Sequence, residues 1–191
     1  MSENTMKRSI LLTQSVLTME SLQDAMRIIL EVNEHDDEQE KKFVDYKREP
    51  IKMTINTYGG TAYGMFALIS IMKQSKTPIH TYGYGAIMSA GFGLFAYGHK
   101  RFTDENATFM YHGVGYGSWG TLPHHKQEME QNEKLQKYYD AIFLDNSNMK
   151  RSDMQDAVDR QAYLYLSGAE AVKVGVADEI ITEALPRKRG N

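Results

Sequence analysis

Ser89 and His112 are the two residues whose chemistry and placement in the sequence most favour catalysis. Ser89 lies in the small-residue segment 85–91, where a predicted strand turns into a predicted helix, and His112 ends the predicted strand 108–112. A serine hydroxyl is a weak nucleophile that needs a base within hydrogen-bonding distance, and histidine can serve as that base. Each residue alone has a plainer explanation, as a helix N-cap or a structural histidine, but their placement after neighbouring strands favours acyl transfer.

Glycine-rich turns near these residues could supply the hydrogen-bond donors that acyl transfer needs. Gly59 and Gly60 follow the predicted strand 51–56, and a second set of free N–H groups lies at the start of the helix after Ser89. The tetrahedral oxyanion of acyl transfer must be met by fixed donors. Because glycine has no side chain, its backbone N–H can closely approach a substrate carbonyl.

Apolar segments alternate with helical patterns along the chain, which predicts an α/β domain with a parallel sheet. In such sheets, ligand sites lie beyond the carboxyl ends of the strands, at strand-to-helix turns. The turns 58–60, 85–90 and 112–117 are therefore where we expect the site. The predicted strands are 10–13, 51–56, 79–84, 108–112, 162–166 and 179–181.

The predicted helices differ in how much apolar surface they can bury. The helix after Gly60 has a continuous apolar face, formed by Met65, Leu68, Ile69 and Met72. The long helix from Pro123 to about Leu144 has only a thin stripe and is expected to project. The residues of that stripe are Met129, Tyr138, Ile142 and Phe143.

Composition narrows the possible classes of function. At 191 residues the chain is one domain, and 22 basic against 25 acidic residues give a net charge of −3, without the basic footprint of a nucleic-acid binder. The absence of cysteine excludes disulfides, a thiol nucleophile and cysteine-bound metal, and permits a reducing compartment. The polar N-terminus and short first apolar run lack a signal peptide or membrane span, so we expect a cytoplasmic protein.

Three other sequence patterns give weaker evidence for a function. Segment 115–120 matches G-x-G-x-x-G, but the polar, proline-containing sequence that follows argues against a dinucleotide site. His124 and His125 are adjacent, so on a helix they point about 100° apart and do not form a metal pair. The charge run 31–42 is interpreted as a solvated loop or helix extension, with a partner-binding acidic patch as the alternative.

An ordered set of motifs resembles the Clp protease proteolytic subunit (ClpP) family over about residues 51–181. The motifs are Asn56–Gly60, Gly85–Gly91, Met110–His112, Leu164–Val172 and Gly175–Ile180. The resemblance implies an α/β fold of the crotonase/ClpP type, with repeated ββα or βα units and a protruding handle helix. It also implies a single peptidase domain over residues 1–191, with a charged insertion at 31–48 and the handle at about 113–145.

The resemblance further implies an ATP-dependent type of serine endopeptidase, with Ser89 as nucleophile, His112 as general base, and the backbone N–H groups of Gly60 and Ala90 as the oxyanion hole. Family members form homo-oligomers of heptameric rings stacked as a barrel and cleave unfolded polypeptides inside it. A separate AAA+ unfoldase of the ClpX or ClpA type uses the ATP. No cofactor or metal on this chain, and no nucleic-acid or membrane partner, is implied.

The third catalytic residue departs from the family pattern. The family places an aspartate four residues before the serine of the Leu-Ser-Ala-Glu-like motif, a position that Tyr163 occupies here, and Ala162 replaces the adjacent arginine. Asp159 is the nearest carboxylate and our candidate for the third member, with a solvent-facing helix residue as the plainer alternative. The Tyr163 hydroxyl or a water is a further candidate to orient His112.

Two other functions remain open at this point. The first is a catalytically impaired structural ring subunit, suggested by Tyr163 and Ala162 at the positions of the acid and of the ring-pairing arginine. The second is an acyl-CoA enzyme that shares the crotonase fold, suggested by the two oxyanion turns alone. The Ser89 and His112 pair argues against the acyl-CoA enzyme.

Overall fold

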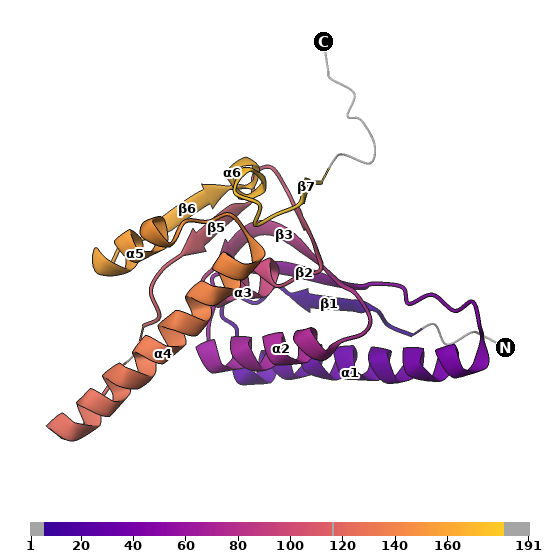
Figure 1. Cartoon of the computed structure of the whole chain (residues 1–191), viewed down its shortest axis with the longest axis horizontal. Helices are drawn as coiled ribbons and strands as arrows, with labels where there is room; N and C mark the ends of the chain where they lie inside the picture. The colour runs from indigo at the N-terminus through magenta and orange to yellow at the C-terminus, as the bar shows by residue number, and fades with distance from the viewer. Residues whose placement is uncertain (1–5, 116, 182–191) are drawn as a thin grey trace, which may run out of the picture.

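A seven-stranded sheet forms the centre of the computed structural model, which describes residues 6–115 and 117–181 (Figure 1). Its main path runs β1-β2-β3-β4-β7, and β5 pairs with the far end of β3 and with β6. All pairs are parallel except β5 with β6. The strands are β1 (Ser9–Leu12), β2 (Ile51–Thr57), β3 (Ile79–Met88), β4 (Lys100–Thr103), β5 (Thr108–Tyr111), β6 (Leu164–Ser167) and β7 (Glu179–Ile180).

The structure confirms the predicted α/β class with its largely parallel sheet. It also contains β4, which the sequence analysis did not predict, because its residues Lys-Arg-Phe-Thr show no apolar alternation and only Thr103 is buried. Strand β3 is longer than predicted. Its first half pairs with β4 and its last residues pair with β5, so β3 forms ladders with both strands at different positions.

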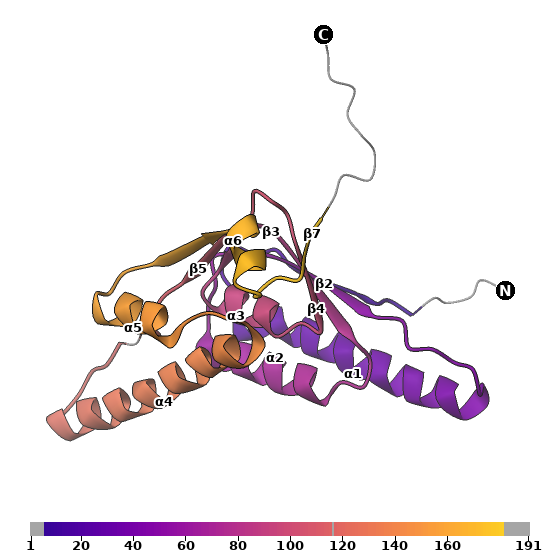
Figure 2. The ribbon, with the colours of Figure 1, turned by 45° about the horizontal axis from the view of Figure 1, so that its top comes forward.

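Helices accompany the sheet, and Figures 1 and 2 show α1 and α2 side by side along one of its faces. Capping boxes start two of them, formed by Thr18 and Ser21 at α1 and by Ser167 and Glu170 at α6. The predicted apolar face of α2 is buried at all four positions. The helices are α1 (Met19–Lys42), α2 (Ala62–Gln74), α3 (Ala90–Ala96), α4 (Leu122–Asn146), α5 (Arg151–Asp159) and α6 (Gly168–Lys173).

The charge run 31–42 continues α1 as a helix, one of the two predicted forms. Asp36 departs from the expectation of a solvated surface, because it is fully buried. It accepts hydrogen bonds from Arg8, Tyr46 and Thr77. Burial alone would raise the pKa of Asp36, but these hydrogen bonds outweigh it and lower the pKa to about 2. These hydrogen bonds of Asp36 connect the C-terminal half of α1 to the segments that lead into the strands.

Helix α4 projects beyond the sheet, as predicted, and its N-terminal half extends away from the other elements (Figures 1 and 2). The predicted apolar stripe was half wrong, because Met129 and Tyr138 are exposed. The buried positions follow one helical face instead, at a spacing of four, three and one residues. They are Leu135, Tyr139, Ile142 and Phe143.

Within residues 6–115 and 117–181, none of the helices combines the length and the apolarity that crossing a membrane would take. The G-x-G-x-x-G segment precedes α4 rather than opening a helix on the sheet, and its Tyr116 lies outside the described residues.

Candidate active site

Ser89 lies at the sharp turn between β3 and α3. Its backbone has φ +52° and ψ −125°, a conformation that a residue with a side chain rarely adopts and that the surrounding structure must hold in place. The Ser89 N–H donates to the carbonyl of Met110 at 2.8 Å, and the Ser89 carbonyl accepts from the hydroxyl of Tyr139 at 2.9 Å. The turn therefore presents the Ser89 hydroxyl above the ends of the strands.

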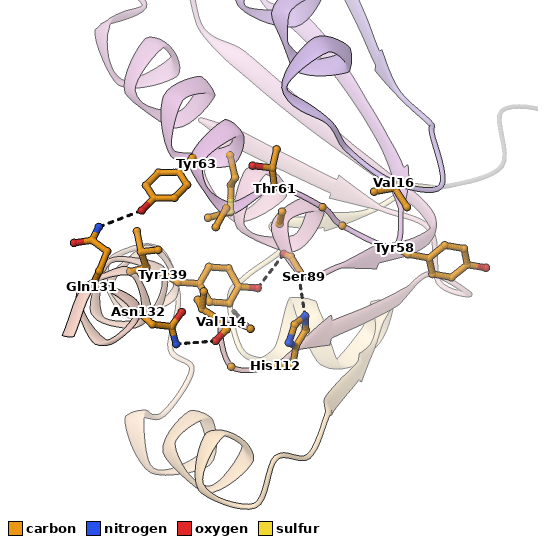
Figure 3. A pocket seen from close by; sticks show the side chains of 18 of the residues that line it. Val16, Tyr58, Thr61, Tyr63, Ser89, His112, Val114, Gln131, Asn132 and Tyr139 are labelled. Carbon is orange, nitrogen blue, oxygen red and sulfur yellow. Dashed lines mark hydrogen bonds between the residues drawn. The ribbon is translucent and has the colours of Figure 1, made fainter. Parts of the chain in front are cut away.

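His112 reaches the same place from β5. Strands β3 and β5 run parallel with Met88 paired to Met110, so both chains leave the sheet at the same edge. The Nε2 atom of His112 lies 2.8 Å from Oγ of Ser89 (Figure 3). The structure thus brings the two sequence-predicted residues into hydrogen-bonding contact, the arrangement in which a histidine can take the proton of a serine nucleophile.

Gly59 and Gly60 pass close to Ser89 in a turn that only glycine can form. Gly59 has φ +107°, and a Cβ there would lie 2.6 Å from Cβ of Ser89. A Cβ at Gly60 would lie 1.9 Å from the carbonyl oxygen of Leu17. Among the described residues, no acceptor is found for the backbone N–H of Gly60 or of Ala90. Both residues line the cavity beside Ser89, where free N–H groups can meet an oxyanion.

A cavity of about 550 Å³ adjoins Ser89, between the Gly59–Gly60 turn, α2 and α4. Its wall includes the apolar side chains of Met65, Val114 and Leu135. Polar groups lie toward α4, where Asn132 donates to the carbonyl of Val114 at 3.0 Å (Figure 3). A mainly apolar cavity with a few placed polar groups is suited to an amino-acid side chain next to the reacting carbonyl.

The third position is not filled by a carboxylate in the described structure. Asp159 is the last residue of α5 and accepts a hydrogen bond from Gln155 at 2.8 Å, and no hydrogen bond joins it to His112. Tyr163 is the residue that lies beside His112. The two rings are 6.0 Å apart between centroids and nearly perpendicular, at 85°.

Tyr139 is a residue of the site that was not predicted from the sequence. It is buried, its ring stacks on Tyr111 at 5.3 Å with an interplanar angle of 6°, and its hydroxyl donates to the Ser89 carbonyl. Burial raises the pKa of Tyr139 well above its ordinary value, so the hydroxyl stays a neutral donor. Helical spacing from Phe143 could have placed Tyr139 in the core, but nothing local indicates that it reaches Ser89.

A polar network under β5 holds the segment after His112. The hydroxyl of Tyr111 donates to Asp140 at 2.5 Å, and Gln136 donates to the same carboxylate oxygen at 2.7 Å. Gln136 also accepts from the N–H of Val114 at 2.7 Å. Burial and the neighbouring carboxylate raise the pKa of Tyr111. The network fixes both the end of β5 and the chain after His112 to α4.

Comparisons with known proteins found similar sequences over most of the chain. The family model described as Clp protease matches residues 4–184. The chain is 26% identical over 144 residues to a protein of Deinococcus radiodurans named ATP-dependent Clp protease proteolytic subunit, and the match covers 74% of this chain and 70% of the relative. The chain therefore belongs to the Clp protease family, as a divergent member.

Proposed function

We propose that this chain is a serine endopeptidase that cleaves unfolded polypeptides with Ser89 as nucleophile and His112 as general base. Oγ of Ser89 attacks the peptide carbonyl while Nε2 of His112 takes the hydroxyl proton. The backbone N–H groups of Gly60 and Ala90 bind the resulting oxyanion. His112 then gives the proton to the leaving amine. In deacylation His112 takes a proton from the water that attacks the acyl carbonyl, and returns it to Oγ of Ser89 as the ester bond breaks and the acid product leaves.

The observation that carries this proposal is the 2.8 Å contact between Ser89 and His112 at the wall of the cavity. The strained backbone of Ser89 also supports the proposal, because such strain is common at functional sites. By family, the chain is a Clp-type serine protease. The proposal adds that the site in this chain is active.

Assembly and partners form the second part of the proposal. The projecting α4 would serve as the handle that joins two homo-oligomeric rings, heptameric as in the family, into a closed chamber. The name of the Deinococcus relative describes it as the proteolytic subunit of an ATP-dependent protease. We accordingly assign ATP use to a separate AAA+ unfoldase of the ClpX or ClpA type. We also propose that this chain binds no cofactor and that it is located in the cytoplasm.

The test is covalent labelling of the assembled protein with a fluorophosphonate probe, read by mass spectrometry of the labelled peptide. We expect one adduct on Ser89 and none in Ser89→Ala. Hydrolysis of a short fluorogenic peptide should fall by at least about 10³-fold in Ser89→Ala. Absence of labelling at Ser89, under conditions that label a ClpP of known activity, refutes the catalytic role.

A catalytically impaired ring subunit is the second candidate, and Tyr163 at the position of the family's aspartate favours it. Such a subunit would assemble with an active paralogue and show no turnover alone. Peptide hydrolysis by the purified homo-oligomer that is abolished in Ser89→Ala removes this candidate. Assembly into rings without any such hydrolysis supports it.

A further inference from the structure

Tyr163 lies opposite His112 because of the register between β5 and β6. These strands pair antiparallel with Tyr111 opposite Leu164, so the next position on each chain places His112 opposite Tyr163. Residues directly opposite in an antiparallel pair have Cβ atoms about 4.5–5.5 Å apart. The two rings meet edge to face, with centroids 6.0 Å apart.

The hydroxyl of Tyr163 does not make this contact. The side chain is 61% exposed, and among the described residues no hydrogen bond joins its hydroxyl to the imidazole. What meets His112 is the aromatic ring. Perpendicular aromatic pairs are attractive because the positive edge of one ring faces the negative face of the other.

Two carboxylates on the helices near His112 make hydrogen bonds to other residues. Asp140, on α4, is held by Tyr111 and Gln136, and Asp159, on α5, is held by Gln155. A second cavity, of about 700 Å³, lies between His112, α4 and α5. The charged residues that line it are Glu133, Lys137, Asp140 and Arg151. None of them hydrogen-bonds to His112 in the part of the chain that the structure describes.

We propose that Tyr163 is a positioning residue whose aromatic ring, rather than its hydroxyl, holds the imidazole of His112 in the orientation that keeps Nε2 on Ser89. The ring stands where the family has an aspartate and limits rotation of the imidazole through the edge-to-face contact. This inference rests on the proposed peptidase function, because it concerns how the same histidine is oriented.

Three substitutions separate the ring from the hydroxyl and from simple volume. Tyr163→Phe keeps the ring, Tyr163→Leu keeps apolar bulk, and Tyr163→Ala removes both. We expect kcat to be within about twofold of the wild type in Tyr163→Phe. In Tyr163→Leu and Tyr163→Ala we expect kcat to fall about threefold to tenfold, which lies within the interaction energy of such aromatic pairs, while KM stays unchanged.

Tyr165→Leu is the matched control. Tyr165 is also on β6, is 53% exposed, and contacts the ring of Tyr163 rather than that of His112. It should leave kcat unchanged. Thermal unfolding and gel filtration of every variant check that the fold and the assembly are intact, which the exposure of Tyr163 leads us to expect.

The outcomes distinguish this inference from the proposed function. If the wild-type protein neither hydrolyses peptide nor reacts with fluorophosphonate at Ser89, the proposed function itself is refuted. A wild-type protein that does both, with Tyr163→Leu and Tyr163→Ala at full kcat, overturns the positioning role alone. A loss in Tyr163→Phe equal to that in Tyr163→Ala assigns the role to the hydroxyl and equally overturns the inference. A lower kcat in Tyr163→Leu and Tyr163→Ala, together with a kcat near that of the wild type in Tyr163→Phe, supports the inference.

Discussion

Tyr139→Phe tests whether the strained backbone of Ser89 is held from α4. The substitution removes the hydroxyl that donates to the Ser89 carbonyl at 2.9 Å and keeps the ring that stacks on Tyr111. The carbonyl is not left without partners, because it also accepts from the N–H groups of Phe92 and Gly93 at 2.9 and 3.1 Å. The change therefore isolates one hydrogen bond.

The expected cost follows from that single bond. A buried hydrogen bond between neutral groups contributes about 1 kcal/mol to the free energy of unfolding. For a chain of this size, that corresponds to a lowering of Tm by about 2–4 °C. If the same energy holds Ser89 at φ +52°, its loss lowers kcat by about fivefold without changing KM.

Chemical or thermal unfolding and peptide hydrolysis measure the two effects. Tyr138→Phe is the control, since Tyr138 is the neighbouring residue on α4, is 59% exposed, and has no hydrogen bond from its hydroxyl in the described structure. The control should match the wild type in both assays. If Tyr139→Phe also matches the wild type in both, the hydroxyl of Tyr139 does not hold the nucleophile and the reasoning fails.

Two more predictions concern the oxyanion turn and the buried carboxylate. Gly60→Ala should abolish hydrolysis and Ser89 labelling, because its Cβ would lie 1.9 Å from the carbonyl oxygen of Leu17, whereas Gly117→Ala, with open space around it, should match the wild type in both assays. Asp36 has a pKa of about 2 in the folded protein and near 3.8 when unfolded, so its stabilisation of about 2 kcal/mol is present above pH 4 and is lost as the pH falls through 2. The free energy of unfolding in urea, measured between pH 5 and pH 2, should show this loss in the wild type and should vary less with pH in Asp36→Asn. A wild-type profile as flat as that of the variant contradicts it.

The features that sequence predicted well are those encoded over a few neighbouring residues. The apolar face of α2 depends on side chains within two helical turns, and β2 depends on the residues of one strand. Ser89 and His112 could be identified because strand-to-helix turns in parallel sheets converge at one edge. Their 2.8 Å contact is the consequence of the β3–β5 register.

The features that sequence analysis missed depend on residues far apart in the chain. Asp36 is part of a charge run, yet Arg8 and Thr77 make its burial possible. Tyr139 could be assigned to the core from its spacing, but its hydroxyl reaches the Ser89 carbonyl fifty residues away. In each case the partner is set by tertiary packing rather than by any local pattern.

The position of the missing acid shows why register outweighs proximity in sequence. Asp159 precedes Tyr163 by only four residues, but it belongs to α5. That helix ends in a turn closed by a hydrogen bond from the N–H of Ala162 to the carbonyl of Ala157 at 2.9 Å, with Gln161 at φ +50°. Moving Asp159 toward His112 would require that turn to unwind and β6 to slip against β5. A slip of one residue would turn every side chain of β6 to the opposite face. The residue opposite the imidazole is therefore determined by the β5–β6 pairing, and in this chain it is Tyr163.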